Sequence, residues 1–290
     1  MKALKRIGAV LLGLILLITL VAVVLFFIGG REVGRTFDLP TDRLLTENRS
    51  SLANIERGGH LAKILGCTDC HGENLEGTAF VDAPPFLVSA SNLTDGRGGV
   101  GKSYEMADWD RAIRYGVKPD GSPVFFMMPS RLYHGLGDDD MADLATYLDN
   151  LAPQDNELPE SKFRPLGKLI VGAGGIDPSN QVSDLDRSRG LTPVRGATAE
   201  YGAYLSSVTC VECHGNDLRG APHPEPEGPF GPSLADAAGW DLDIFANALQ
   251  FGINSDDEQM DPKWMPWTAF RHMTDEEVKA LHLHLQRNFQ

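Results

Sequence analysis

The stretch Cys67-Thr68-Asp69-Cys70-His71 recurs later in the chain as Cys210-Val211-Glu212-Cys213-His214. Two cysteines at this spacing lie about one helical turn apart, so each thiol can add to a vinyl group of the same porphyrin. The histidine after the second cysteine is then held beside the iron as an axial ligand. The two stretches use all 4 cysteines of the chain. The pattern therefore predicts two covalently attached haem c groups, held by Cys67, Cys70, His71, Cys210, Cys213 and His214.

Other uses of paired cysteines fit these stretches less well. In zinc sites the two C-x-x-C pairs usually lie much closer together in the sequence, and a fourth ligand closes the site. A redox-active C-x-x-C is expected in a βαβ context, and the sequence around neither pair indicates one. A disulfide within each pair would close a very short and strained loop.

The size and charge of the chain limit the classes of partner. A length of 290 residues suggests about two domains. The formal net charge is −14, from 40 acidic and 26 basic residues. This charge argues against nucleic acid as a partner and favours a redox partner with a basic docking surface, in encounters that weaken as salt is raised. The same acidity would also keep the protein soluble, which is an equally good reason for it.

The N-terminal segment has the features of a membrane anchor. Residues 7–28 contain no charge and no proline, and this length is sufficient for a helix that crosses a bilayer. A cleaved signal peptide would have a shorter apolar region and a small-residue cleavage site, and no A-x-A pattern follows the apolar run here. Lys2, Lys5 and Arg6 precede the run, which places the N-terminus in the cytoplasm. We therefore expect a single-pass protein of the cytoplasmic membrane, with the haem-binding part on the periplasmic side.

Apolar periodicity and loop-forming residues divide the rest of the chain into segments. Apolar spacing predicts helices over residues 51–65, 105–115 and 138–151, with loops over most of residues 72–101. Gly59 is expected where the first of these helices crosses another one closely. The predicted division is an anchor (1–30), a tether (31–50), a first domain (51–152), a connector (153–196) and a second domain (197–290).

The second domain repeats the first. The pattern His-Gly-x-x-Leu-x-Gly occurs at residues 71–77 and again at residues 214–220. Met128-Pro129 likewise corresponds to Met265-Pro266, and each pair precedes a helix with an acidic start. An internal repeat of this kind indicates a duplicated domain.

The methionine of each Met-Pro pair is the candidate distal ligand. A neutral thioether suits a haem iron that already carries a histidine, and proline keeps the preceding residue extended, as a ligand on a loop should be. This favours Met128 over its neighbour Met127, which would point the other way and pack. Met265 is favoured in the second domain. The alternatives are Met127 and His134 for the first iron, and Met260, His272 and Met273 for the second.

With these motifs, each half resembles a class I cytochrome c domain: an N-terminal helix, C-x-x-C-H, a loop, a distal methionine and a C-terminal helix. The order of short motifs is similar to that in the cytochrome c subunits of membrane-bound alcohol and sugar dehydrogenases. These motifs are Asn92-Leu93-Thr94, Gly99-Val100-Gly101, Tyr115-Gly116, Met128-Pro129 and Tyr147-Leu148. Those subunits carry three haem sites, whereas this chain has two. The resemblance implies an all-α fold, with two tandem cytochrome c domains after the transmembrane helix.

The resemblance also implies a support for each haem-ligating histidine. The ring Nδ1 of such a histidine usually donates to a backbone carbonyl, which a proline in the loop after the haem motif supplies in similar domains. The corresponding positions are Pro85 and Pro232.

These features predict a membrane-anchored dihaem cytochrome c that transfers single electrons and is not itself an enzyme. Its partners would be a respiratory, photosynthetic or dehydrogenase component and a second redox protein. One alternative is a dihaem enzyme such as a cytochrome c peroxidase, which needs an iron with an open position. The other is a haem-bearing docking subunit of a larger membrane complex.

Overall fold

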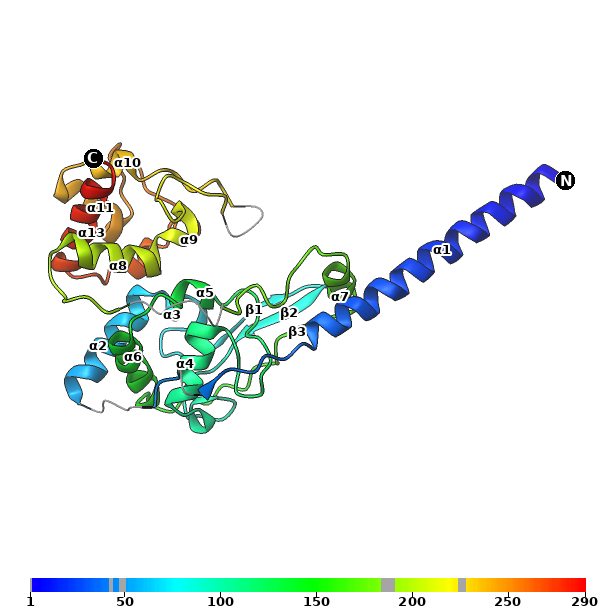
Figure 1. Cartoon of the computed structure of the whole chain (residues 1–290), viewed down its shortest axis with the longest axis horizontal. Helices are drawn as coiled ribbons and strands as arrows, with labels where there is room; N and C mark the ends of the chain where they lie inside the picture. Colours follow the sequence, from blue (N-terminus) through cyan, green and yellow to red (C-terminus); the bar gives the residue numbers. More distant parts are fainter. Residues whose placement is uncertain (1, 42–43, 47–50, 184–190, 224–227) are drawn as a thin grey trace.

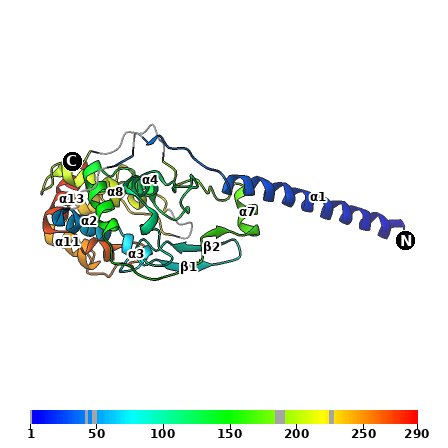
Figure 2. The same ribbon diagram turned by 90° about the horizontal axis from the view of Figure 1, so that it is seen from below.

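A computed structural model describes the chain except for residues 1, 42–43, 47–50, 184–190 and 224–227. A long N-terminal helix, α1 (Lys2–Val33), projects from a body made of two lobes (Figure 1). The first lobe contains α2 to α6 and a small sheet, and the second lobe contains α8 to α13. Seen from below, α1 leaves the body beside the sheet and the short helix α7 (Pro165–Gly172) (Figure 2).

Helix α1 forms from a run that has neither charge nor proline between Arg6 and Arg31. Its apolar side chains are exposed over most of its length. Within the part of the chain that the structure describes, this is the one helix long and apolar enough to cross a membrane. An apolar surface of this extent is typical of a membrane-spanning helix and also of a signal sequence.

The first lobe is built on the crossing of α2 (Leu52–Ile64) and α6 (Asp138–Asp149). The hydroxyl of Ser51 caps α2 by accepting from the N–H of Asn54. A Cβ at Gly58 would overlap the carbonyl oxygen of Asp143 and lie 2.6 Å from the Cβ of Tyr147. The glycine that permits the crossing is therefore Gly58 rather than the expected Gly59, beside which only the Tyr147 ring lies.

The remaining helices of the first lobe are short. They are α3 (Cys67–His71), the 3-10 helix η2 (Gly101–Ser103), α4 (Met106–Tyr115) and α5 (Ser130–Tyr133). Glu105 and Asp108 form a capping box at the start of α4, and Gly116 ends this helix in the left-handed conformation with φ of 69°. The helices predicted over residues 51–65, 105–115 and 138–151 agree with α2, α4 and α6 to within two residues at each end.

A small antiparallel sheet modifies the all-α expectation. Strands β1 (Thr78–Asp82) and β2 (Phe86–Ala90) form a hairpin where the sequence analysis expected a loop, and β3 (Lys162–Phe163) adds to the other edge of β2. Thr78 pairs with Ala90, and Phe86 pairs with Phe163. The aromatic and β-branched residues of residues 80–88 favour strands, but Ala83-Pro84-Pro85 between them concealed the pairing.

The segment between the lobes packs along the first lobe before it reaches the second. The carbonyl of Gln154 accepts from the side-chain amide of Asn92 at 2.7 Å. Arg195, near the end of the segment, pairs with Asp140 at 2.8 Å and with Asp143 at 3.2 Å. Between these two points the chain forms β3 and α7, and α7 packs against the end of α1 (Figure 1).

The second lobe repeats the helix crossing of the first. Its helices are α8 (Ala199–Thr209), α9 (Val211–His214), α10 (Ala235–Ala238), α11 (Leu242–Phe251), α12 (Trp267–Phe270) and α13 (Asp275–Asn288). Helix α8 crosses α13 at Gly202, where a Cβ would overlap the carbonyl oxygen of Ala280. Gly202 thus corresponds to Gly58, which supports the duplication in three dimensions.

The two lobes share one hydrophobic core. Buried apolar side chains form a continuous cluster that extends from Leu61 in the first lobe to Leu285 in the second. Polar groups also cross the boundary: Arg57 donates to Glu277 at 3.0 Å, and the hydroxyl of Tyr204 donates to Asp140 at 2.9 Å. The contact between the lobes is therefore both apolar and charged, and it holds the two haem motifs in a fixed arrangement.

Candidate haem-binding sites

The first cysteine pair lies on α3, a helix of one turn. Gly66 precedes it in the left-handed conformation with φ of 73°, and Gly72 ends it with φ of 83°. The thiol of Cys67 is half-buried and that of Cys70 is exposed, and neither is in a disulfide. Burial raises the pKa of Cys67 to about 12, and it raises the pKa of Cys70 as well. Both groups are thus neutral thiols, one turn apart, at the surface of the first lobe.

The His71 ring is oriented by the backbone. Its Nδ1 lies 2.7 Å from the carbonyl oxygen of Ser91. Burial lowers the pKa of His71, against the opposite effect of this hydrogen bond, so the imidazole is neutral near pH 7. With the proton on Nδ1, the lone pair of Nε2 is available to a metal ion.

Ser91 supplies the carbonyl for which the resemblance implied Pro85, so that expectation is wrong. The carbonyl of Pro85 instead accepts from the N–H of Arg164 at 2.9 Å, at the turn end of the β1–β2 hairpin. The hairpin separates Pro85 from the haem motif and returns the chain to His71 only at Ser91. A signal was present in the sequence, because Leu93 lies two residues after Ser91 as Leu234 lies two residues after Pro232.

The second motif has the same design in the second lobe. The ring Nδ1 of His214 lies 2.8 Å from the carbonyl oxygen of Pro232, which is the contact expected from the sequence. A Cβ at Gly231 would overlap the carbonyl oxygen of Cys213, so glycine permits this close return of the chain. Burial lowers the pKa of His214, and it raises the pKa of the Cys210 thiol.

The loop after each histidine fixes where the supporting carbonyl lies. Leu75 and Leu218, the fourth residues after His71 and His214, are buried and have φ of 59° and 60°. Left-handed leucine is unusual, so the surrounding structure must hold it. The carbonyl of Leu75 accepts from the N–H of Leu93 at 2.9 Å, and the carbonyl of Leu218 accepts from Leu234 at 2.9 Å. Ser91 and Pro232 lie two residues before Leu93 and Leu234, so these backbone hydrogen bonds fix the positions of their carbonyl groups relative to the histidines.

The first Met-Pro pair presents two methionines differently. Met128 is half-buried against the core, whereas Met127 is 42% exposed. The packing role expected for Met127 is therefore not what the structure shows. His134, the other alternative, is 1% exposed and its Nδ1 lies 3.1 Å from the carbonyl of Arg114. Of these three side chains, Met128 is the half-buried one without a hydrogen bond to the backbone, and it therefore stays the favoured candidate for the distal ligand.

The second Met-Pro pair has the same local structure. Met265 is half-buried against the core, and Pro266 leads directly into α12 as Pro129 leads into α5. Met273 is 3% exposed within the core, and His272 is exposed. Met260 is half-buried, and its carbonyl accepts from the Trp267 indole at 3.1 Å.

Tyr133 is a residue near the first haem motif that the sequence analysis did not find. Its side chain is buried, and its hydroxyl donates to the carbonyl of Leu65 at 2.6 Å. Burial raises its pKa, and so do the nearby Cys67, Cys70 and Glu212, the last of which belongs to the second motif. The internal repeat could have indicated this position, because an aromatic residue follows the methionine by five residues in both lobes: Tyr133 after Met128, and Phe270 after Met265.

The donor set of each lobe fits a covalently bound haem. It comprises two neutral thiols one turn apart, a neutral imidazole fixed through Nδ1, and a half-buried thioether. The cysteines and the histidine of each motif lie on or directly beside a short helix, so their spacing depends mainly on the backbone.

Comparisons with known proteins agree with this geometry. The family model for cytochrome c matches residues 55–152 and 199–288, which together exceed half of the chain. The chain is 30% identical over 181 residues to the cytochrome c subunit of a quinone-type alcohol dehydrogenase from Gluconobacter oxydans, covering 56% of this chain and 35% of that protein. It is 29% identical over 180 residues to a subunit of the nicotinate dehydrogenase from Pseudomonas putida, covering 59% of this chain and 15% of the relative.

A dihaem relative matches over a larger part of its length. The "diheme cytochrome c-type" protein of Cereibacter sphaeroides is 28% identical over 228 residues, which are 69% of this chain and 74% of the relative. The matches to the dehydrogenase components cover only a minor part of those proteins. The two matched segments, each with its C-x-x-C-H motif, show that this chain belongs to the cytochrome c family and is an electron-transfer protein.

Proposed function

We propose that this protein is a membrane-anchored cytochrome c that binds two haem c groups and passes single electrons between two redox partners. The observation that carries the proposal is the duplicated support of the histidines, with His71 bonded to Ser91 and His214 to Pro232. A histidine held in this way in both lobes argues for a haem in each.

The residues have separate roles in this proposal. Cys67, Cys70, Cys210 and Cys213 bind the two porphyrins through thioether bonds. Haem, when bound, supplies a one-electron redox centre. His71 and Met128 would hold the haem iron in the first lobe, and His214 and Met265 would hold it in the second. With two protein side chains holding each iron, each centre would exchange electrons and would leave no position for a substrate.

The proposed organisation follows the sequence expectation. Residues 1–30 are the anchor, 31–50 the tether, 51–152 the first cytochrome c domain, 153–196 the connector and 197–290 the second domain. Part of the tether and part of the connector lie outside the described residues. Lys2, Lys5 and Arg6, at the start of α1 and before its apolar run, support a cytoplasmic N-terminus, with both haems on the periplasmic side.

The partner is proposed to be a dehydrogenase or another membrane redox complex. Two relatives are named as components of an alcohol dehydrogenase and of a nicotinate dehydrogenase, which supports a role as the electron-accepting subunit of such a complex. The net charge of −14 supports a basic docking surface on the second redox protein.

Haem stoichiometry and partner capture test this proposal in one preparation. The full chain, purified from native membranes in mild detergent, should contain two haems that acid–acetone does not extract. It should co-purify with a dehydrogenase or oxidase component whose substrate reduces both haems. One haem per chain, or haem lost to acid–acetone, would contradict the dihaem proposal, and reduction by no membrane donor would contradict the carrier role.

A further inference from the structure

The short helix α7 lies directly against the end of α1. A Cβ at Gly172 would overlap the carbonyl oxygen of Leu25 and lie 3.1 Å from the backbone nitrogen of Gly29. A Cβ at Gly29 would overlap the carbonyl oxygen of Lys168. The backbones of the two helices therefore touch, and α7 occupies a fixed level along α1.

That level falls within the charge-free part of α1. Leu25 and Gly29 precede Arg31, the first charged residue after the apolar run. Leu25 lies six residues before Arg31, which is about 9 Å along the helix axis. Amphipathic helices at a membrane surface are buried to about 5–10 Å. If α1 crosses the bilayer, α7 therefore reaches into the outer interfacial layer.

The composition of α7 suits that position. Its sequence is Pro-Leu-Gly-Lys-Leu-Ile-Val-Gly, and the side chain of Leu166 is 46% exposed. The ammonium group of Lys168, its one charge, lies 5.6 Å from the ring centroid of Phe26. A cation this close to an aromatic ring is attracted by the face of the ring, and the attraction is stronger where water is excluded.

The direction of α7 also agrees with insertion. Lys168 lies beside Gly29, and Gly172 lies beside Leu25, so the C-terminal end of α7 is the deeper end. Arg164, just before the N-terminal end of α7, pairs with Asp82 at 2.6 Å. The charged Arg164 thus lies at the shallow end, and the uncharged residues 169–172 form the deep end.

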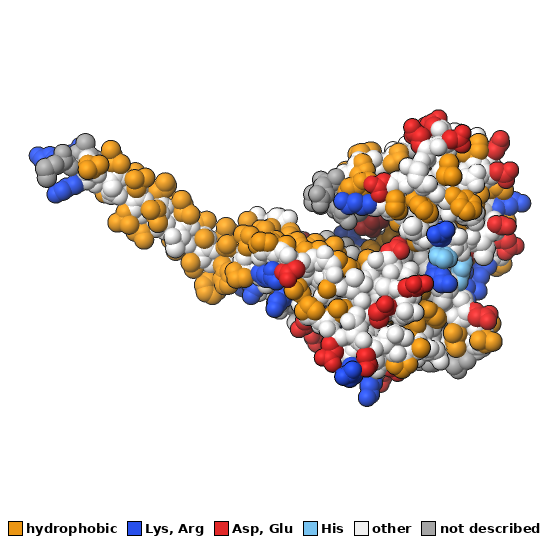
Figure 3. Space-filling model, turned by 180° about the vertical axis from the view of Figure 1, so that it is seen from behind, with side chains coloured by type: hydrophobic (Ala, Val, Ile, Leu, Met, Phe, Trp, Pro, Cys, Tyr) orange, Lys and Arg blue, Asp and Glu red, His pale blue; other side chains and the backbone are white. Residues whose placement is uncertain are grey.

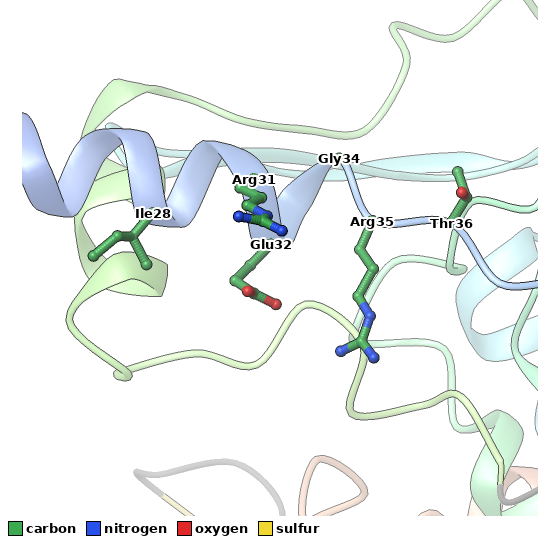
Figure 4. Close-up of a pocket in the computed structure, with 6 residues that line it drawn as sticks. All are labelled: Ile28, Arg31, Glu32, Gly34, Arg35 and Thr36. Carbon is green, nitrogen blue, oxygen red and sulfur yellow. The ribbon is translucent and has the colours of Figure 1, made fainter.

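Charged residues mark the expected water boundary on α1 itself. Figure 4 shows Arg31, Glu32 and Arg35 with Ile28 around a hollow where α1 ends, and these residues line a pocket there. Figure 3 shows hydrophobic side chains that cover α1 and continue onto the adjoining part of the body. The apolar surface therefore does not end with α1.

We infer that α7 is a second membrane contact, which inserts beside α1 into the outer interfacial layer of the bilayer and holds the first lobe against the membrane. The inference rests on the proposed anchoring by α1. An aromatic cluster connects this contact to the first haem site: Phe163 stacks on Phe125 with ring centroids 5.0 Å apart. Phe163 is two residues before α7, and Phe125 is three before Met128.

Photo-crosslinking to lipid tests the inference in the full chain. Benzoylphenylalanine replaces Leu166 in α7, Leu16 in α1 or Leu191, which is 89% exposed. The proteins are reconstituted in phosphatidylethanolamine–phosphatidylglycerol vesicles with an alkyne tag on the acyl chains. The adduct at Leu166 should approach that at Leu16, and it should exceed that at Leu191 by roughly tenfold because an interfacial helix contacts acyl chains.

The three positions separate the possible failures. A strong adduct at Leu16 with Leu166 no higher than Leu191 would overturn the inference and leave the anchor intact. Background labelling at Leu16 would overturn the anchor and the inference together. In the Leu166-labelled protein, Gly172→Leu should force the helices apart and reduce the adduct several-fold. Gly13→Leu, at a position with no neighbour within 4 Å, should leave it unchanged.

Discussion

Each haem-motif histidine is oriented by one backbone carbonyl, so its orientation depends on the path of the chain and not on a partner side chain. For His71 that carbonyl belongs to Ser91, and for His214 it belongs to Pro232. A serine and a proline serve equally well, because only the carbonyl is used. The identity of the axial sulfur ligand, in contrast, depends on a side chain and can be tested by substitution.

The first test concerns the distal ligand of the first haem. Met128→Ala should remove about half of the sulfur–iron charge-transfer absorption, lower one reduction potential and let the reduced protein bind carbon monoxide at one haem. Met127→Ala is the matched control, because the Met127 side chain is 42% exposed and should leave the spectrum unchanged. Loss of the absorption in the control alone would move the ligand to Met127.

The second lobe permits the same test independently. Met265→Ala should remove the other half of the charge-transfer absorption and lower the second potential. Met260→Ala is its control. The backbone carbonyl of Met260 accepts a hydrogen bond from the Trp267 indole, and this bond remains when the side chain is replaced. If Met260→Ala changed the spectrum and Met265→Ala did not, the assignment in this lobe would be reversed.

Most of the candidate site could be read from the sequence because its chemistry is local. The cysteines and histidine of each motif lie within one turn, and Met265-Pro266 repeats Met128-Pro129. Ser91 could not be read from its own motif, because its place depends on a hairpin that pairs Thr78 with Ala90, and only the comparison of Leu93 with Leu234 indicated it. Long-range pairing of this kind has no signal within a single turn of chain.

At the scale of the elements, each lobe depends on one close helix crossing. Gly58 in α2 and Gly202 in α8 allow the crossings with α6 and α13. Sequence periodicity predicted the first pair of helices, because their apolar faces recur at helical spacing. It placed the crossing one residue late, at Gly59, because two adjacent glycines are distinguishable only by which one faces the partner helix.

The helix crossing predicts that replacement by alanine lowers the unfolding free energy at Gly58 but not at the neighbouring Gly59. Gly58→Ala should destabilise the protein by about 1–3 kcal/mol, because the new methyl group meets the backbone of α6. Gly59→Ala should be neutral, or stabilising by up to about 1 kcal/mol from helix propensity, because its methyl group meets only the movable Tyr147 ring. The unfolding free energy in guanidinium measures both. Equal values for the two variants would contradict the crossing at Gly58.

At the scale of the whole molecule, the two lobes behave as one body because their cores are continuous and charged groups cross the boundary. Figure 3 shows histidine and basic side chains gathered where the lobes meet. Glu277, at the start of α13, is buried among such groups: it lies 2.8 Å from His60 and 3.0 Å from Arg57. A buried carboxylate with these partners should make the joint between the lobes sensitive to acid.

Burial raises the pKa of Glu277, but hydrogen bonds from His60, the Thr274 N–H and Arg57 outweigh it and lower the pKa from 4.5 to about 2. A carboxyl whose pKa is lowered by folding stabilises the folded state above its unfolded pKa. This stabilisation should therefore be fully present above about pH 5 and decline as the pH falls from 4.5 to 2. At 1.36 kcal/mol for each pKa unit, it is on the order of 3 kcal/mol.

Glu277→Gln should consequently lower the unfolding free energy at pH 7, and the difference from the unsubstituted protein should shrink as the pH falls toward 3. The substitution leaves Arg57 and His60 without their carboxylate, and Asp140, 3.5 Å from Arg57, becomes the nearest remaining acidic group. Glu276→Gln, one residue earlier and exposed, is the matched control and should change the pH dependence little. Guanidinium unfolding of the full chain in detergent at pH 7, 5, 4 and 3 measures all three proteins. A difference that stays constant across this range would mean that the charge of Glu277 does not hold the lobes together.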